Sequence, residues 1–325
     1  MLNSFTCRRL VLGVVLLTGL VLAGVPSAVA QTPTLTAAVR AAIAKQDFAG
    51  AEQLVANDRK ARGVTPDGLE AMSWLGRGAL AAERWDAADT YARDTYALAI
   101  AALKGRTMDQ EPRLPIAIGA AMEVRAHVAA HRGERSEAVA TLKRELATYK
   151  DTSLAKRIQK NINLLSLEGT PAPALDLSEA LAPKSLSLTD VKGKVAVLFF
   201  WAHWCPDCKT QAPILEELLD RYGSQGLTVV APTQRYGYVA RGKDAGPQEE
   251  NKYIEEIRAT YYGFLPPTAV AMSEENHRRY GVSTTPTVVV IDRRGIVRSY
   301  HPGTMSKAEL EPLVARLLGE QAGTR

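Results

Sequence analysis

The sequence contains little cysteine. Three cysteines occur in 325 residues, at Cys7, Cys205 and Cys208, which is too few for a fold held together by disulfides. Cys205 and Cys208 are separated by Pro206 and Asp207, and no second Cys-x-x-Cys completes a four-cysteine zinc site. The five histidines show no metal-ligand spacing near this pair. We therefore predict that the pair performs redox chemistry and holds no metal.

The chain also lacks blocks of basic residues. Its formal net charge is +5, and no Lys/Arg-rich stretch indicates nucleic acid or an anionic membrane surface as a partner. His127 and His131 lie four residues apart on an expected helix, a spacing that can chelate a metal ion. Nothing adjacent completes the ligand set, so we interpret both histidines as surface residues.

Residues 1–30 have the pattern of a secretory signal peptide. Arg8 and Arg9 precede an apolar run over residues 10–25, and Ala-Val-Ala at 28–30 supplies a small-x-small cleavage pattern. The alternative is an uncleaved membrane anchor, because residues 10–25 approach the length that spans a bilayer. Cleavage would also remove Cys7. We expect a mature protein in the periplasm or otherwise outside the cytoplasm.

Residues 31–167 lack the β-branched and aromatic runs that strands require, so we expect helices throughout. Three similar stretches, at 45–51, 83–88 and 132–138, each place a small alanine three residues after Phe48, Trp85 or Arg135. These stretches resemble tetratricopeptide repeats, in which Trp-Leu-Gly at 74–76 also falls near the expected start of a helix pair. Because the spacing is unequal, an ordinary helical bundle is the alternative. Either arrangement leaves a face on which a protein partner is expected to bind.

A stretch with two prolines and a glycine, residues 168–173, ends the last helix and places a second domain at 168–325. Apolar runs at 195–200 and 227–231 predict buried strands, and the helical pattern at 208–222 between them implies a parallel, right-handed crossover. The remaining expected elements are a polar loop (234–247), a helix (251–261), a short strand (268–272), a short helix (274–280), a hairpin (287–300) and a capped helix (306–318). The predicted fold is an all-α helical-repeat domain followed by an α/β domain.

The cysteine pair lies where the first buried strand turns into a helix. Free backbone N–H groups and the helix dipole at such a position lower a cysteine pKa from about 8.5 to roughly 3.5–7.5. Cys205 is therefore the predicted nucleophile, and Cys208, one turn further along, is the predicted resolving thiol. Pro206 suits the first helical turn because it has no N–H. The Asp207 carboxylate opposes a thiolate at Cys205, which predicts a potential of about −270 to −200 mV rather than a strongly oxidising one.

The motif Trp-Cys-x-x-Cys-Lys at 204–209, after an apolar strand, is similar to the active site of the thioredoxin superfamily. Pro213 matches that family's helix-kinking proline, and residues 281–287 resemble its cis-proline loop, with Pro286 as the cis residue. The resemblance implies a central mixed sheet flanked by helices. It also implies a substrate-binding surface made by Trp204, the backbone of Thr285, and Pro286.

Further features resemble the TlpA/ResA branch of that superfamily, which works outside the cytoplasm, usually as a reductase. They are the leader, Leu-Ser-Leu at 186–188 ahead of Lys-Gly-Lys at 192–194, and the insertion before the cis-proline loop. Two positions depart from the pattern. Thioredoxin has a buried aspartate where this chain has Phe199, and ResA-like proteins have a glutamate where it has Gln211. The base that activates Cys208 is thus left open, with Glu216 and Glu217 as candidates by position alone.

Three further residues lie near the predicted site in the sequence. His203, between Trp201 and Trp204, is expected at the rim of the cysteine site, with a role as a proton relay as the alternative. Tyr236 and Tyr238 are interpreted as part of a packed loop rather than as a substrate-binding surface.

The combined prediction is an exported thiol–disulfide oxidoreductase that reduces protein disulfides and needs no bound cofactor. A membrane thiol electron donor would re-reduce the pair, and the helical domain would recruit the client protein. A peroxide reductase shares the fold but needs Thr/Ser-x-x-Cys, where this chain has Ala-His-Trp-Cys at 202–205. The alternative from another functional class is a periplasmic binding module, such as a copper chaperone or a repeat scaffold, with a thioredoxin-like fold.

Overall fold

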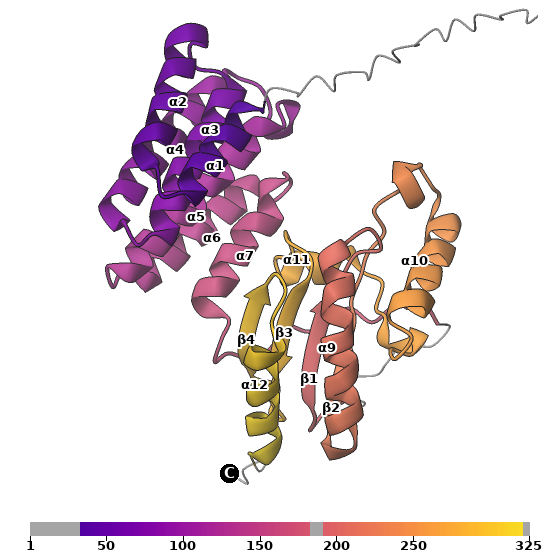
Figure 1. The fold of residues 1–325 in the computed structure, drawn as a ribbon. Coiled ribbons are helices and arrows are strands. Elements are labelled where there is room, and N and C mark those ends of the chain that lie inside the picture. Colours follow the sequence, from indigo (N-terminus) through magenta and orange to yellow (C-terminus); the bar gives the residue numbers. More distant parts are fainter. Residues whose placement is uncertain (1–32, 183–190, 321–325) are drawn as a thin grey trace, which may run out of the picture. The chain divides into compact units, whose positions relative to one another are not determined.

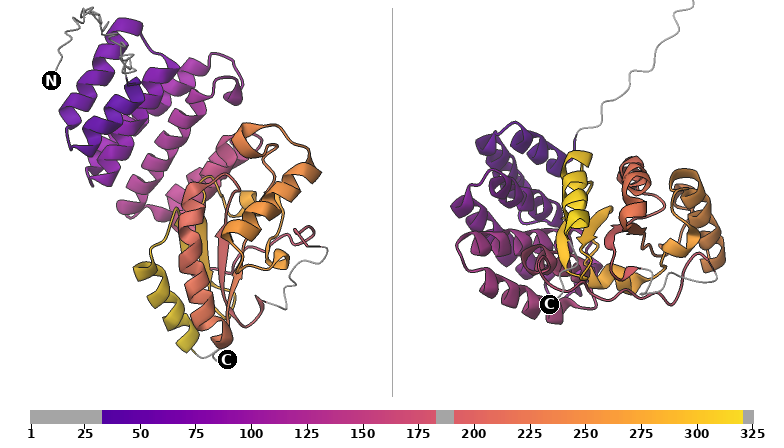
Figure 2. Two further views of the ribbon diagram at one scale, coloured as in Figure 1. Left: turned by 45° about the vertical axis from the view of Figure 1, so that its right-hand side comes forward. Right: turned by 90° about the horizontal axis from the view of Figure 1, so that it is seen from below.

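The structure is a computed structural model that describes residues 33–182 and 191–320 (Figures 1 and 2). The expected signal peptide at 1–30 and the Leu-Ser-Leu segment at 186–188 lie outside the described residues. Within those residues, no helix is long and apolar enough to cross a membrane.

The first part of the described chain is helical, as the composition predicts (Figure 1). A single 3₁₀ turn, Met108–Gln110, lies in the loop between the fourth and fifth helices. The helices are α1 (Leu35–Ala44), α2 (Phe48–Arg62), α3 (Pro66–Ala81), α4 (Trp85–Leu103), α5 (Arg113–His131), α6 (Arg135–Tyr149) and α7 (Leu154–Ser166).

Three helix pairs, α1–α2, α3–α4 and α5–α6, turn in the same way. The residue two positions before the second helix of each pair has a positive φ, and it is Gln46, Glu83 or Gly133. The next residue donates its backbone N–H to the carbonyl five positions earlier, at 2.9–3.0 Å in all three turns. The alanines expected to allow close approach are buried: Ala51, Ala88 and Ala138. The three similar sequence stretches are therefore equivalent turns.

The expectation for Trp-Leu-Gly at 74–76 is wrong in position. These residues lie in the middle of α3 and not at its start. Gly76 is nevertheless used for close packing, because a Cβ there would lie 3.6 Å from the backbone nitrogen of Ala92 on α4.

The second part contains a mixed four-stranded sheet in the order β2–β1–β3–β4. β1 (Val195–Phe200) is parallel to β2 (Leu227–Val230) and antiparallel to β3 (Thr287–Ile291), and β3 is antiparallel to β4 (Val297–Pro302). The predicted parallel crossover runs through α9 (Pro206–Tyr222). The other helices of this part are α10 (Pro247–Tyr261), α11 (Glu274–Arg279) and α12 (Lys307–Gly319).

Every residue of β1 is buried, because both faces of the sheet are covered. On one face, Val197 and Phe199 belong to a core that includes Leu215 of α9, Ile254 of α10 and Leu310 of α12. On the other face, alternate residues of β1 join a second core; these are Ala196, Leu198 and Phe200, packed with Tyr280, Val282, Tyr300 and Leu167. Figure 1 shows α9 and α12 side by side over the first face. The central strand is thus fixed from both sides, and its carboxyl end carries the cysteine motif.

Residues 268–272 do not form the expected strand. Ala271 and Met272 make only isolated bridges, to Ala180 and Thr233. A 3₁₀ turn, Pro267–Ala269, takes up the first two residues of this segment, and Pro266 and Pro267 before them have no N–H to offer to a ladder.

Helix α10 begins four residues earlier than the sequence pattern suggested, at Pro247. Proline is favoured in the first helical turn, and Glu249 and Glu250 follow there.

Helix α7 packs against α11 and the segment that follows it. Lys156 forms an ion pair with Glu274 at 3.2 Å, and Asn163 Nδ2 donates to the carbonyl of Arg279 at 3.4 Å. Gly281 has a φ of +59°, and a Cβ there would overlap the backbone nitrogen of Lys160. Only glycine permits this approach without a shift of one backbone relative to the other.

Candidate active site

The site lies where β1 turns into α9, as the sequence predicts. After Phe200 the chain makes a short turn in which the N–H of Cys205 donates to the carbonyl of Ala202 at 3.1 Å. Trp201 is fully buried, and its indole N–H donates to the carbonyl of Ala231 at 3.1 Å, which ties the end of β1 to the end of β2. Cys205 is the N-cap residue of α9, and Pro206 occupies the first helical position. The motif is thus held by two strands and one helix.

Cys205 and Cys208 form a disulfide, with their Cα atoms 5.4 Å apart. Sγ of Cys205 accepts the backbone N–H of Cys208 at 3.1 Å. Both residues are buried, with 2% of Cys205 and none of Cys208 exposed. In the reduced protein this N–H, together with the N-terminal end of the helix dipole, stabilises a thiolate on Cys205.

The cis-proline loop lies against the cysteines. The Thr285–Pro286 peptide bond is cis. The carbonyl oxygen of Thr285 is 3.4 Å from Sγ of Cys205. The loop is held by two hydrogen bonds, one from the Thr287 hydroxyl to the carbonyl of Thr284 at 2.7 Å and one from the N–H of Gly303 to the carbonyl of Pro286 at 2.8 Å. The structure therefore brings the distant 285–286 segment to the predicted nucleophile.

The exposed surface around the pair is rich in aromatic groups. Trp204 is 47% exposed and packs edge-on against Tyr236. The ammonium of Lys209 lies 4.1 Å from the ring centroid of Tyr261, which is also exposed. Pro206 and Asp207 are exposed on the first turn of α9. Pro213 lies further along α9, inside the helix, at the position where the sequence placed it.

Neither of the two departures from the family pattern supplies a titrating group. Phe199 is fully buried in β1. Gln211 is 1% exposed, and its Oε1 accepts the N–H of Met305 at 2.7 Å. The Gln211 amide thus holds the segment before α12 and cannot exchange a proton near neutral pH.

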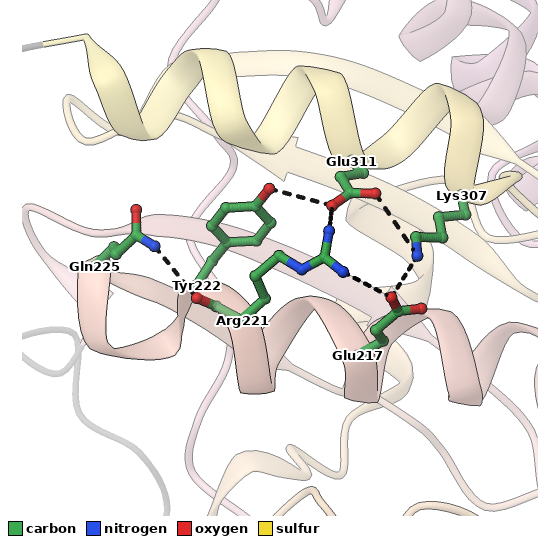
Figure 3. A network of polar contacts seen from close by, with 6 residues as sticks. All are labelled: Glu217, Arg221, Tyr222, Gln225, Lys307 and Glu311. Atoms are coloured by element: carbon green, nitrogen blue, oxygen red, sulfur yellow. Dashed lines mark hydrogen bonds and ion pairs between the residues drawn. The ribbon is translucent and has the colours of Figure 1, made fainter.

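Glu216 and Glu217 do not face the cysteines. Glu216 is exposed. Figure 3 shows Glu217 in a network between α9 and α12, where it pairs with Lys307 and, at 3.1 Å, with Arg221. Glu311 of α12 closes the network by accepting from the hydroxyl of Tyr222 at 3.2 Å. The network joins the two helices. Because Glu217 is paired with Lys307 and Arg221 in it, Glu217 is not the base that activates Cys208.

The expectation for His203 is wrong, because it is buried and not at the rim. Its side chain is 1% exposed, and its Nε2 lies 3.3 Å from Oε1 of Glu250, which is equally buried. The Glu250 carboxylate also accepts the backbone N–H groups of Tyr236 at 2.5 Å and Gly237 at 2.9 Å. Sequence reasoning missed Glu250, because an acid in the first turn of a helix is ordinarily a solvated residue.

Three tyrosine rings enclose the imidazole of His203. Tyr236, Tyr238 and Tyr253 approach it edge-on, with centroid separations of 5.5, 5.3 and 5.2 Å. Burial lowers the pKa of His203, and the hydrogen bond to Glu250 acts in the opposite direction. Tyr236 and Tyr238 therefore pack in the loop, as expected, and they pack on this histidine.

Within residues 33–182 and 191–320, no group of three or more His, Cys, Asp or Glu side chains is arranged to hold a metal ion. Of the helical-region histidines, His131 is exposed and stacks on Trp85, with ring centroids 3.7 Å apart. His127 is half-buried, and that burial lowers its pKa.

A Cys-x-x-Cys disulfide at the start of the crossover helix, in a mixed sheet and beside a proline loop, defines the class of thioredoxin-like redox proteins. Comparison with known proteins gives the family. The AhpC/TSA family matches residues 169–300. The thioredoxin-like protein YneN of Bacillus subtilis is 31% identical over 145 residues, which are 44% of this chain and 76% of that protein. The thiol-disulfide oxidoreductase ResA of Geobacillus thermodenitrificans is 31% identical over 143 residues, which are 44% and 74%. The chain belongs to the thioredoxin-like thiol–disulfide oxidoreductases and is an enzyme of that kind.

Among solved structures, the thiol:disulfide interchange protein of Chlorobium tepidum covers 46% of this chain and 97% of its own, with 27% identity and a TM-score of 0.38. The AhpC/TSA family match begins at residue 169 and therefore lies in the α/β part of the chain.

Proposed function

We propose that Cys205 and Cys208 are the redox pair of an exported reductase of protein disulfides. The observation that supports this most directly is the position of Cys205 at the N-cap of α9, where its Sγ accepts the N–H of Cys208 at 3.1 Å. A sulfur in this position is the better thiolate of the two, and therefore the attacking group.

The reaction proceeds in two exchanges. The Cys205 thiolate attacks one sulfur of a client disulfide, a mixed disulfide forms, and the other client sulfur leaves as a thiolate. The Cys208 thiolate then attacks Sγ of Cys205, which re-forms the Cys205–Cys208 disulfide and releases the second client thiolate. The client gains two electrons, and the pair must be reduced again by a thiol donor, which we place in the membrane.

The client chain is proposed to lie along Trp204, the backbone of Thr285, and Pro286. Trp204 is an exposed aromatic group next to Cys205 in the chain, and the carbonyl of Thr285 lies 3.4 Å from Sγ of Cys205. Pro206 and Asp207 support the reaction by fixing the helix start and by opposing excessive stabilisation of the thiolate. The helical part, residues 31–167, is proposed to recruit the client, and the signal-like residues 1–30 are proposed to direct export.

A trap variant tests the assignment of the two cysteines. Replacing Cys208 with Ala removes the resolving thiol, so mixed disulfides between Cys205 and client proteins should accumulate and be released by dithiothreitol. The same preparation with Cys205→Ala is the matched control and should capture little. The wild-type protein should catalyse the reduction of insulin disulfides, with turnover lost in both variants.

Other outcomes separate the competing functions. Equal capture by the two single variants would mean that the roles of the cysteines are wrongly assigned. Tight copper binding by the reduced protein without insulin turnover would favour a binding module, and turnover of hydrogen peroxide in place of insulin would favour a peroxide reductase.

A further inference from the structure

The buried His203–Glu250 pair is defined by three hydrogen-bond contacts. Each oxygen of Glu250 accepts one backbone N–H, from Tyr236 or from Gly237, and Oε1 also lies 3.3 Å from Nε2 of His203. In its carboxylate form Glu250 only accepts hydrogen bonds, and Nε2 of His203 then carries a hydrogen whether the ring is neutral or charged. The atom that gains or loses a proton is therefore Nδ1.

Nδ1 of His203 is buried and has no hydrogen-bond partner among the described residues. With Nδ1 bare, the pair carries one negative charge, and with Nδ1 protonated it is neutral. The other titratable groups that face the imidazole are Tyr236, Tyr238 and Tyr253. Burial raises the pKa of both Tyr236 and Tyr238, which keeps these phenols neutral. The charge of this enclosed cluster thus depends on a single proton.

This proton is close to the redox pair. His203 lies inside the turn that the hydrogen bond from Cys205 to Ala202 closes, two residues from Cys205. The Cα atoms of His203 and Cys205 can therefore be no more than about 7 Å apart. Polar groups around Sγ of Cys205 include the backbone N–H of Cys208 at 3.1 Å, the Thr285 carbonyl at 3.4 Å, and Asp207 in the first turn of α9. A unit charge gained or lost at this range, in a partly screened interior, changes the ratio of thiolate to thiol by about tenfold.

We propose that His203 positions the proton of the redox reaction: it binds a proton on Nδ1 when the Cys205–Cys208 disulfide is reduced, and the resulting neutral His203–Glu250 pair stabilises the Cys205 thiolate. This inference rests on the function proposed above. It assigns to His203 and Glu250 an electrostatic role that neither Phe199 nor Gln211 can supply, since neither of those side chains titrates.

Reduction of the disulfide takes up two electrons and two protons. A dithiol donor, on oxidation to a disulfide, supplies two electrons and two protons. The electrons break the Cys205–Cys208 bond. One proton ends on Sγ of Cys208 and the other on Nδ1 of His203, and Cys205 is left as the thiolate. When a client disulfide reoxidises the pair, both protons pass through solvent to the two thiols of the client.

Two charge-changing variants separate this role from a structural one. His203→Gln leaves Glu250 as a permanent negative charge, so the fraction of Cys205 thiolate near neutral pH should fall by about tenfold. Glu250→Gln removes that charge, so the thiolate fraction should rise. The readout is the rate of Cys205 alkylation by iodoacetamide between pH 4 and 9, in full-length chains that also carry Cys7→Ala and Cys208→Ala.

The matched control is His277→Gln, because His277 is also 1% exposed but hydrogen-bonds to the carbonyl of Ser273 and to no carboxylate. It should leave the alkylation profile unchanged. If His203 and Glu250 only hold the loop in place, their two variants will shift the profile in the same direction, or neither will shift it. Either result overturns the proposal.

A measurement on the unaltered protein covers the case in which a variant fails to fold. The imidazole ¹H and ¹³C resonances of His203 report its pKa in the oxidised and in the reduced wild-type protein. The expected result is a higher pKa in the reduced form, and equal values in the two forms overturn the proposal. Neither readout requires a client, so failure of the Cys208→Ala trap would count against the proposed function and leave this test standing.

Discussion

At the scale of single residues, the second buried histidine shows the effect of burial on an imidazole that has no hydrogen bond to a carboxylate. His277 packs edge-on against Phe200, its Nδ1 lies 3.3 Å from the carbonyl of Ser273, and its Nε2 has no partner among the described residues. Burial lowers its pKa from 6.5 to about 4. The folded protein therefore favours the neutral ring, whereas the unfolded chain protonates near pH 6.5.

This difference predicts acid sensitivity. Between pH 6.5 and 4 the unfolded state binds more protons than the folded state, so the stability present above pH 6.5 is lost as the pH falls through the folded value. The loss attributable to His277 is up to about 3 kcal/mol. Urea unfolding of the oxidised protein at several pH values measures it. His277→Gln should flatten this part of the profile, and an unchanged slope in that variant would assign the acid sensitivity to other groups.

The sequence predicted the placement of the cysteine motif, which is local, and the family resemblance predicted the distant Thr285–Pro286 segment beside it, but the contact between His203 and Glu250 was missed. Cys205, Pro206 and Cys208 lie in one short motif, so their mutual placement follows from a strand-to-helix turn. The partnership of His203 with Glu250 joins residues 47 positions apart. No periodicity connects such positions, and burial of both groups arises only when the 233–246 loop folds over the end of β1.

At the scale of elements, the contact of α7 with Gly281 places the helical part of the chain beside the cis-proline segment. Gly281 lies five residues before Pro286 in the sequence. The backbone of Gln159 and Lys160 occupies the space that a side chain at Gly281 would need. A close backbone contact of this kind is stiff, because neither partner has a flexible side chain to move aside.

Gly281→Ala is accordingly expected to destabilise the protein strongly. The left-handed backbone costs about 1–2 kcal/mol with a Cβ present, and the overlap with α7 adds about 1–3 kcal/mol. Gly295→Ala is the matched control, since Gly295 also has a positive φ but nothing within 4 Å of the added Cβ. Thermal unfolding of both variants measures the difference. Equal losses would show that α7 yields easily at this point.

Element boundaries were predictable where capping and hydrophobic pattern agree. The last helix begins after Ser306, whose capping box with Glu309 is present as the sequence suggested. The failure at residues 268–272 has the opposite origin. The segment has the apolar composition of a strand, but its neighbours in space form only single bridges with Ala271 and Met272. Whether such a segment becomes a strand depends on its tertiary contacts more than on its composition.

At the scale of the whole molecule, three equivalent helix turns precede one redox site. Phe48 and Trp85 begin the second helices of the first two pairs, as the similar stretches indicated, and Arg135 takes that position in the third. The sequence thus predicted the number of similar turns. It did not predict the helix bounds between them, because the spacing of the second and third turns includes the 3₁₀ turn Met108–Gln110 and the proline-containing loop before α5.

Export of the whole chain can be tested by its processing. Expression in a bacterium with an envelope should yield a mature protein that begins at Gln31 and lacks Cys7. Ala28→Leu and Ala30→Leu together should block cleavage, because signal peptidase sites require small residues at these positions. Intact-mass measurement of the purified chains decides between the outcomes, and a wild-type mass that retains residues 1–30 would favour the membrane anchor.

The two tryptophans that flank the cysteine motif differ in exposure, since Trp201 is fully buried and Trp204 is 47% exposed. An indole this close to a sulfur–sulfur bond loses excited-state energy to it, and regains emission when the bond opens. Tryptophan fluorescence, with a constant contribution from Trp74 and Trp85, should therefore rise when the cysteine pair is reduced and fall when it is reoxidised, without any added dye.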